Sequence, residues 1–105
     1  MPKKRQPREI WRETRRKVWL RDGGICQSPL PSPLCIGKDE PMPLTKCHID
    51  HIKSGKLGTN ELSNLRVLCP VCHALRADER HRALTTKMLQ KNAIPGNWRE
   101  LVWED

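Results

Sequence analysis

Histidines and an aspartate cluster in one short stretch of the sequence. The segment His48-Ile49-Asp50-His51-Ile52 carries two imidazoles and a carboxylate, and a third imidazole, His73, directly follows Cys72. An imidazole titrates near neutral pH, so it can take a proton from water. A carboxylate and an imidazole can hold a divalent ion that stabilises the charge developing on a phosphate. These residue types fit phosphodiester hydrolysis, with His51 as general base and with Asp50 and His73 as metal ligands.

Each of these residues also has a structural interpretation. Asp50 could pair with a lysine, His51 could be a buried hydrogen-bonded imidazole, and Asn64 could only cap a turn. The catalytic interpretation is favoured because all of them occur together, in register with a C-x2-C pair that His73 directly follows.

The five cysteines predict a metal site rather than disulfides, because their number is odd and clustered thiols in a reducing compartment more often bind metal. Cys69-Pro70-Val71-Cys72 can direct two thiolates at one zinc ion, about 2.3 Å from each sulfur. Cys26 and Cys35, which are separated by eight residues, are assigned as the other two ligands. Cys47 remains the alternative to Cys35, and its other interpretation is a small buried hydrophobic residue.

Composition indicates an anionic partner. The chain has 105 residues, a net charge of +8 and 36% hydrophobic residues, without Phe or Tyr. This length suits one domain, residues 1–105, and the small apolar content favours stabilisation by a metal. Nine of the first 21 residues are basic, against two glutamates, which indicates nucleic acid. The residues predicted to contact DNA phosphates there are Arg12, Arg15, Arg16 and Lys17.

The N-terminal part is predicted to be a disordered tail over residues 1–7, followed by a basic helix over residues 8–22 that ends at Gly23-Gly24. Ile10, Trp11, Thr14 and Val18 lie on one arc of that helix and are expected to pack. No apolar run approaches the roughly 18 residues of a membrane span, and no apolar region of a signal peptide follows the basic start.

The rest of the chain is expected to be a core over residues 25–92. A proline-rich connector covers 25–45, and strands cover 45–52 and 64–68 with a glycine-containing loop between them. A helix from His73 to about Lys91 would place Arg76 and Arg80 on one face, toward DNA phosphates. The alternative is that they are solvated or paired with Asp78 and Glu79. A short helix over 97–103, capped by Asn97, ends the chain.

This arrangement resembles the HNH endonuclease family. The string D-H-I, a glycine-containing loop and N-L-x-x-L-C-x-x-C-H match the family's first His, middle Asn and last His at His51, Asn64 and His73. The resemblance covers residues 25–80, includes the cysteines of the zinc-ribbon HNH subgroup, and is strongest to small phage and prophage proteins.

The resemblance implies a small α+β protein with the ββα-metal fold, held by a four-cysteine zinc ribbon. It implies a metal-dependent DNA endonuclease, nicking or cutting both strands, that uses one divalent ion (Mg²⁺, Mn²⁺ or another transition ion). Asn64 would hold the loop and orient His51, and the products would carry a 5′-phosphate and a 3′-hydroxyl. It also suggests the phage packaging (terminase) machinery as a partner, in the cytoplasm of a bacterial host or infected cell. The alternative is a non-catalytic zinc-ribbon module that binds nucleic acid.

Overall fold

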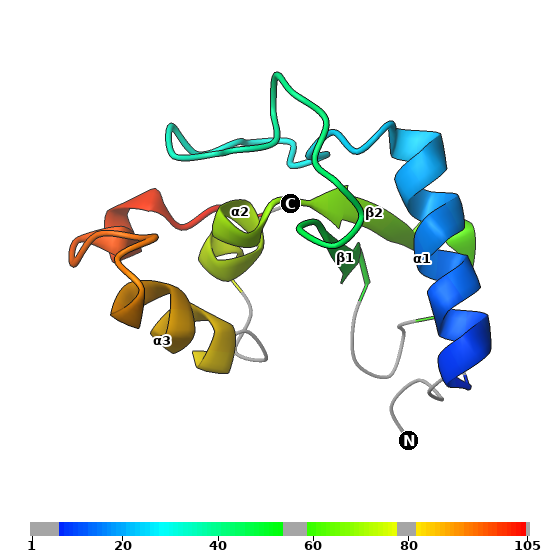
Figure 1. Cartoon of the computed structure of the whole chain (residues 1–105). Coiled ribbons are helices and arrows are strands. Elements are labelled where there is room, and N and C mark those ends of the chain that lie inside the picture. Colours follow the sequence, from blue (N-terminus) through cyan, green and yellow to red (C-terminus); the bar gives the residue numbers. More distant parts are fainter. Residues whose placement is uncertain (1–6, 54–58, 78–81, 105) are drawn as a thin grey trace.

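The computed structural model describes residues 7–53, 59–77 and 82–104 (Figure 1). The predicted order of two strands followed by a helix is present, so the small α+β architecture is confirmed. All but Pro7 of the predicted disordered tail lies outside the described residues. The elements in chain order are α1 (Arg8–Asp22), β1 (His48–His51), a 3-10 helix (Leu62–Asn64), β2 (Leu65–Leu68), α2 (Pro70–Leu75), α3 (Arg82–Gln90) and a second 3-10 helix (Trp98–Leu101).

The two strands pair antiparallel, in a register that sets Asp50 opposite Arg66 and His51 opposite Leu65. Both strands are shorter than the sequence predicts: a turn covers residues 44–46 before β1, and Asn64 belongs to the 3-10 helix before β2. All four residues of β2 are buried, since α1 packs against β2 and α2 lies against β1. Side chains alternate along a strand, so His48 and Asp50 share one face and His51 lies on the other.

The C-terminal end of α1 is hydrogen-bonded to β2. Gly23 closes the helix in a left-handed conformation with φ of 64°, and the Asp22 carboxylate accepts a hydrogen bond from the Val67 amide at 2.9 Å. Thr14 and Val18 are buried, as predicted. Ile10 is 52% exposed, against the prediction, because it lies in the first turn, beyond the buried positions of the helix.

Residues 25–47 form an irregular connector, in accordance with their prolines. Gly24 fixes its start, because its φ is 72° and a Cβ there would lie 2.7 Å from the Met42 carbonyl oxygen. The Met42 amide donates to the Gly24 carbonyl oxygen, and the Cys26 amide donates to that of Gly37. These bonds fold the connector back on itself and bring Cys26 close to α2.

The prediction of one continuous helix from His73 to about Lys91 is wrong, although α3 (Arg82–Gln90) confirms a helix in its second half. α2 ends at Leu75, and Arg76 is extended, with φ of −66° and ψ of 133°. Arg76 instead forms a parallel bridge with Trp103, and the amide of Ala77 donates to the Trp103 carbonyl oxygen. Tertiary contacts of Arg76 therefore override the helical propensity of this segment.

The C-terminal segment completes the core. Trp103 is 4% exposed and donates from its indole nitrogen to the Cys72 carbonyl oxygen at 2.7 Å. The predicted helix over 97–103 is a 3-10 helix of four residues, and the Asn97 side chain bonds Glu100 rather than capping the backbone. No helix within the described parts of the chain has the length and apolar character to cross a membrane.

Candidate functional site

Asp50 lies at the centre of a buried charge network. Its side chain is 1% exposed and accepts three hydrogen bonds. Arg66 Nε, from the opposite position of β2, lies 2.9 Å from Oδ2. Arg76 Nη1 lies 2.7 Å from Oδ1 and 2.9 Å from Oδ2, and the same guanidinium donates to the carbonyl oxygens of His51 and Ile52. A carboxylate with so little exposure needs such partners, because burying an unpaired charge is costly.

His73 faces the same carboxylate from α2. Its Nε2 lies 3.6 Å from Asp50 Oδ1, and its Nδ1 lies 2.9 Å from Nδ1 of His48. The two imidazole rings meet edge to face, with centroids 5.1 Å apart. At that distance one Nδ1 donates a hydrogen bond to the other, while Nε2 of His73 faces Asp50.

Asp50 and His73 fit the divalent ion that the sequence implies. Two ligand atoms about 2.1 Å from one ion lie roughly 3.0–3.4 Å apart, close to the observed 3.6 Å. A carboxylate offers about four acceptor positions, three of which are taken by the two arginines. Among the contacts within the described residues, Oδ2 accepts two of these hydrogen bonds and Oδ1 accepts one, and Oδ1 is the oxygen that faces His73. If His73 binds the ion through Nε2, its other ring nitrogen, Nδ1, would be held by the hydrogen bond with His48. Metal-binding histidines commonly have such a hydrogen-bond partner.

His51 lies on the other face of β1, toward α1. Its Nε2 is 2.9 Å from Oδ1 of Asn60, and its ring stacks on Trp11 with an interplanar angle of 3° and centroids 5.8 Å apart. The ring is half-buried, so solvent reaches it. The predicted general base is therefore held by one hydrogen bond and one aromatic face.

Asn64 joins the two ends of the loop that follows β1. Its Oδ1 accepts from the Lys53 amide at 2.8 Å, and its Nδ2 donates to the carbonyl oxygens of Lys53 and Thr59 at 3.0 and 2.8 Å. These contacts agree with the loop-holding role that the sequence resemblance implies for Asn64. The side chain that bonds the His51 ring is Asn60.

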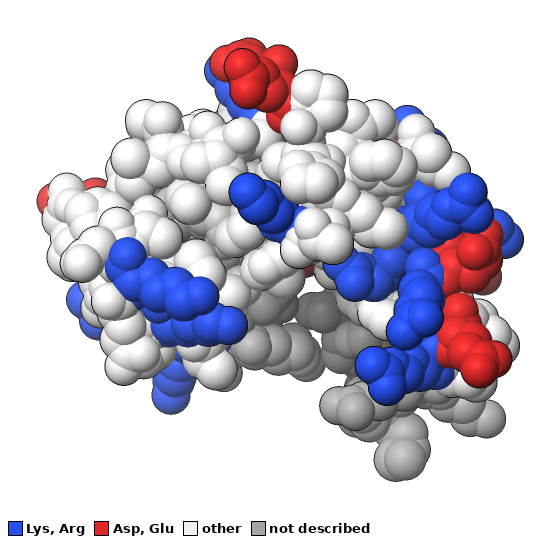
Figure 2. Space-filling view, in the orientation of Figure 1, with Lys and Arg blue, Asp and Glu red and all other residues white. Residues whose placement is uncertain are grey.

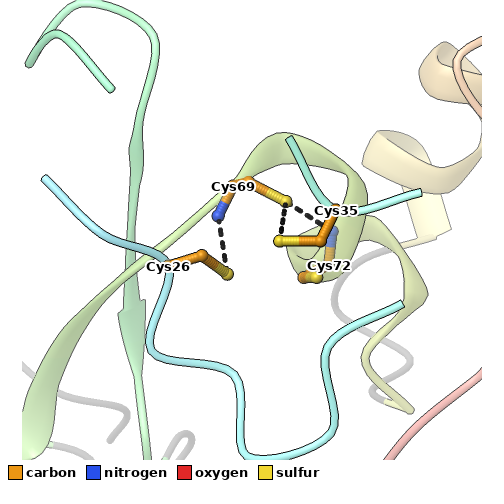
Figure 3. A group of neighbouring side chains, drawn as sticks. All are labelled: Cys26, Cys35, Cys69 and Cys72. Atoms are coloured by element: carbon orange, nitrogen blue, oxygen red, sulfur yellow. Dashed lines mark hydrogen bonds between the residues drawn. The ribbon is translucent and has the colours of Figure 1, made fainter. Parts of the chain in front are cut away.

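Four of the five cysteines form one cluster. The Sγ atoms of Cys26, Cys35, Cys69 and Cys72 all lie within 4.8 Å of one another, with 3.6 Å between Cys35 and Cys69 (Figure 3). Sulfurs at about 2.3 Å from a tetrahedral zinc are roughly 3.8 Å apart, so the cluster could hold this ion. Cys69 and Cys72 come from the start of α2, whereas Cys26 and Cys35 come from the connector.

The hydrogen bonds inside the cluster prepare Cys69 to carry a negative charge. Hydrogen bonds from the thiols of Cys26 and Cys72, together with the Cys72 amide, lower the pKa of Cys69. The same interaction with Cys69 raises the pKa of Cys26 to about 12. Cys47 is outside the group: it is 1% exposed, its thiol donates to the Leu44 carbonyl oxygen, and burial raises its pKa.

Basic side chains line α1 on the face seen in Figure 2, with acidic ones beside them and a second basic group over α3. Arg12, Arg16 and Lys17 are exposed, and Arg16 lies 3.9 Å from Glu13 in an exposed ion pair. Arg15 is half-buried and donates to the Leu44 carbonyl oxygen at 3.3 Å. These exposed cations can attract an anionic backbone.

The structure does not provide the helical face that was predicted for Arg76 and Arg80. Arg76 follows the end of α2, and its side chain, which is 11% exposed, donates hydrogen bonds to the Asp50 carboxylate. Arg80 lies outside the described residues. Sequence reasoning also missed Arg66, Asn60 and Trp11. The strand register could have indicated Arg66, because it sets that residue opposite Asp50; no local pattern indicates the other two.

Comparison with known proteins gives a family match for the segment that holds the site. Residues 33–79 match the family model described as HNH endonuclease. This segment is therefore similar to an HNH endonuclease domain, and it contains Asp50, His51, Asn64, His73 and the connector cysteine Cys35. No curated protein and no solved structure matches the chain.

Proposed function

We propose that this protein is a metal-dependent DNA endonuclease. The observation that carries the proposal is the 3.6 Å approach of Asp50 Oδ1 and His73 Nε2 within an HNH domain, next to the strand position of His51. The coarser conclusion, a nuclease-type domain with a cysteine cluster able to hold zinc, follows from the family match and the cluster itself.

In the proposed reaction, His51 takes a proton from a water molecule as its oxygen attacks the phosphorus. The bond from phosphorus to the 3′ oxygen breaks, and the leaving oxygen takes a proton from solvent water, which gives a 5′-phosphate and a 3′-hydroxyl, as the family resemblance implies. Asp50 and His73 would hold the divalent ion, which supplies stabilisation of the charge on the phosphate and the leaving oxygen. Arg66 and Arg76 keep the Asp50 carboxylate in place for that role.

DNA would be bound by the exposed basic side chains of α1, among them Arg12, Arg16 and Lys17. This helix also contacts the site directly through Trp11. A DNA backbone that follows α1 would therefore pass close to His51. The four-cysteine cluster would hold a structural zinc that fixes the connector to the start of α2.

The second candidate is a zinc-ribbon module that binds nucleic acid without cleaving it. The basic helix and the cysteine cluster would be sufficient for that function. A binding module does not need a buried Asp50 paired with His73, and this pairing favours the nuclease.

A plasmid assay tests the proposal. Supercoiled DNA is incubated with the purified protein and Mg²⁺ or Mn²⁺, with a chelator control and a zinc determination on the same sample. Nicked or linear product that requires the added ion supports the nuclease and reports whether one or both strands are cut. Intact plasmid, with zinc bound and DNA retained in a gel, supports the binding module. A cytoplasmic place and a phage packaging partner rest on the family resemblance, and recovery of terminase proteins with the tagged protein from infected cells would test them.

A further inference from the structure

We infer that Trp11 and Asn60 are positioning residues for His51, and that together they leave Nδ1 as the nitrogen that takes the proton. This inference rests on the proposed nuclease function. It adds a residue of α1, outside the matched HNH segment at residues 33–79, to the machinery of the site.

The contact with Asn60 selects one tautomer of the His51 ring. An amide oxygen can only accept a hydrogen bond, so the 2.9 Å contact requires a proton on His51 Nε2. In a neutral imidazole, the lone pair is then on Nδ1. Asn60 thereby decides which ring nitrogen is the base, in the way that outer partners of catalytic histidines do.

Trp11 fixes the plane of the same ring. Rings that are parallel to within 3° with centroids 5.8 Å apart form an offset stack, one of the favoured aromatic geometries. Trp11 is held in turn because α1 is anchored through buried Val18 and through the bond between Asp22 and Val67. The stack prevents rotation out of the plane, and the Asn60 bond prevents rotation within it.

The roles of the two asparagines in this part of the chain differ. Asn64 bonds backbone groups of Lys53 and Thr59, so it holds the loop. Asn60 contacts the imidazole itself. Loss of Asn64 should disturb the whole loop, whereas loss of Asn60 should release one ring.

The test is nitrogen NMR of the histidine rings, combined with cleavage kinetics. In the unaltered protein, we expect the His51 ring, assigned with His51→Ala, to show a protected Nε2 proton and ring protons shifted upfield by Trp11. Asn60→Ala should remove the protected proton, and Asn60→Asp, which keeps an acceptor oxygen, should retain it. Trp11→Leu should remove the upfield shift, and Trp11→Phe should keep part of it.

In kinetics, Asn60→Ala and Trp11→Leu should each lower kcat by about 10–100-fold and leave KM for DNA within about twofold. The conservative variants should recover most of that loss. Asn97→Ala and Trp98→Leu are matched controls elsewhere in the chain and should leave kcat unchanged. Circular dichroism and zinc content establish that each variant is folded.

The two readouts separate this inference from the proposed function. A neutral His51 ring that carries its proton on Nδ1, or that exchanges freely between tautomers, overturns the inference. So does an active enzyme whose kcat is the same in Asn60→Ala and Trp11→Leu as in the unaltered protein. The NMR signature in a protein that cleaves no DNA would overturn the nuclease proposal but keep the ring geometry.

Discussion

Asp50 and Arg66 face each other across the two-stranded sheet and form an ion pair of 2.9 Å in which neither side chain is more than 9% exposed. Opposite charges directly across an antiparallel pair are favourable, and burial makes each dependent on the other. Arg76 adds a second cation to the same carboxylate. The position of a proposed metal ligand is thus fixed by two arginines from two different parts of the chain.

Replacement of Arg66 by methionine should destabilise the protein strongly. It leaves the buried Asp50 carboxylate with one cation, and breaking a buried pair costs about 3–5 kcal/mol. Urea unfolding of the zinc-loaded protein measures the change. Arg99→Met is the control. The Arg99 guanidinium is exposed and lies over the Trp98 ring at 4.6 Å, as that of Arg66 lies over the Trp103 ring at 5.3 Å, and its loss should cost less than about 1 kcal/mol. Equal losses in the two variants would contradict a stabilising role for the Asp50 network.

Zinc binding should distinguish Cys35 from Cys47. Cys35→Ser removes one of the four clustered sulfurs and should lower zinc affinity by at least about 100-fold, with loss of structure in the connector. Cys47→Ser should keep one zinc per chain, because its sulfur bonds the Leu44 carbonyl oxygen instead. Metal analysis after dialysis against a competing chelator checks both. Zinc lost from Cys47→Ser and kept in Cys35→Ser would reverse the assignment.

Zinc affinity should fall as the pH falls. The hydrogen bond to Cys69 raises the pKa of Cys26 to about 12, so without zinc this thiol keeps its proton at neutral pH and must release it to bind. Each proton released makes the affinity about tenfold weaker per unit of decreasing pH. Competition titrations between pH 8 and 6 measure the slope. A zinc affinity that does not change with pH would contradict the claim that these thiols release protons when they bind zinc.

The charges of α1 should govern the salt dependence of DNA binding. Changing Arg12, Arg16 and Lys17 together to glutamine should reduce the slope of log affinity against log salt by about 2–3, since each phosphate contact contributes about 0.9. The control changes three basic residues of the C-terminal half, Lys87, Lys91 and Arg99, which are also exposed. If only the control reduces the slope, DNA follows the basic group over α3 instead.

The local sequence predicts much of the site because its spacing carries the chemistry. The strand around Asp50, the C-x2-C pair and the adjoining His73 are short-range patterns, and the structure brings the cysteines and the Asp50–His73 pair together. Cys35 is less clearly predicted as the fourth ligand, since eight residues separate it from Cys26 and a zinc knuckle usually has two to four.

What the sequence could not predict depends on contacts between distant segments. Arg76 leaves the helix because Asp50 and Trp103, neighbours only in the fold, bind its side chain and backbone. Helical propensity is a local quantity and carries no information on these partners. The same holds for Trp11, which contacts His51 across 40 positions of the chain.

The most direct test of the account compares DNA cleavage and DNA affinity in one variant. His51→Ala removes the proposed base but leaves Asp50, His73, the cysteines and the basic face of α1 in place. We predict that single-turnover cleavage in the presence of Mg²⁺ or Mn²⁺ falls by at least about 100-fold, with the Kd for the same DNA changed less than about twofold. Cleavage at the unaltered rate by a folded His51→Ala protein would contradict the assignment of the base and the mechanism built on it.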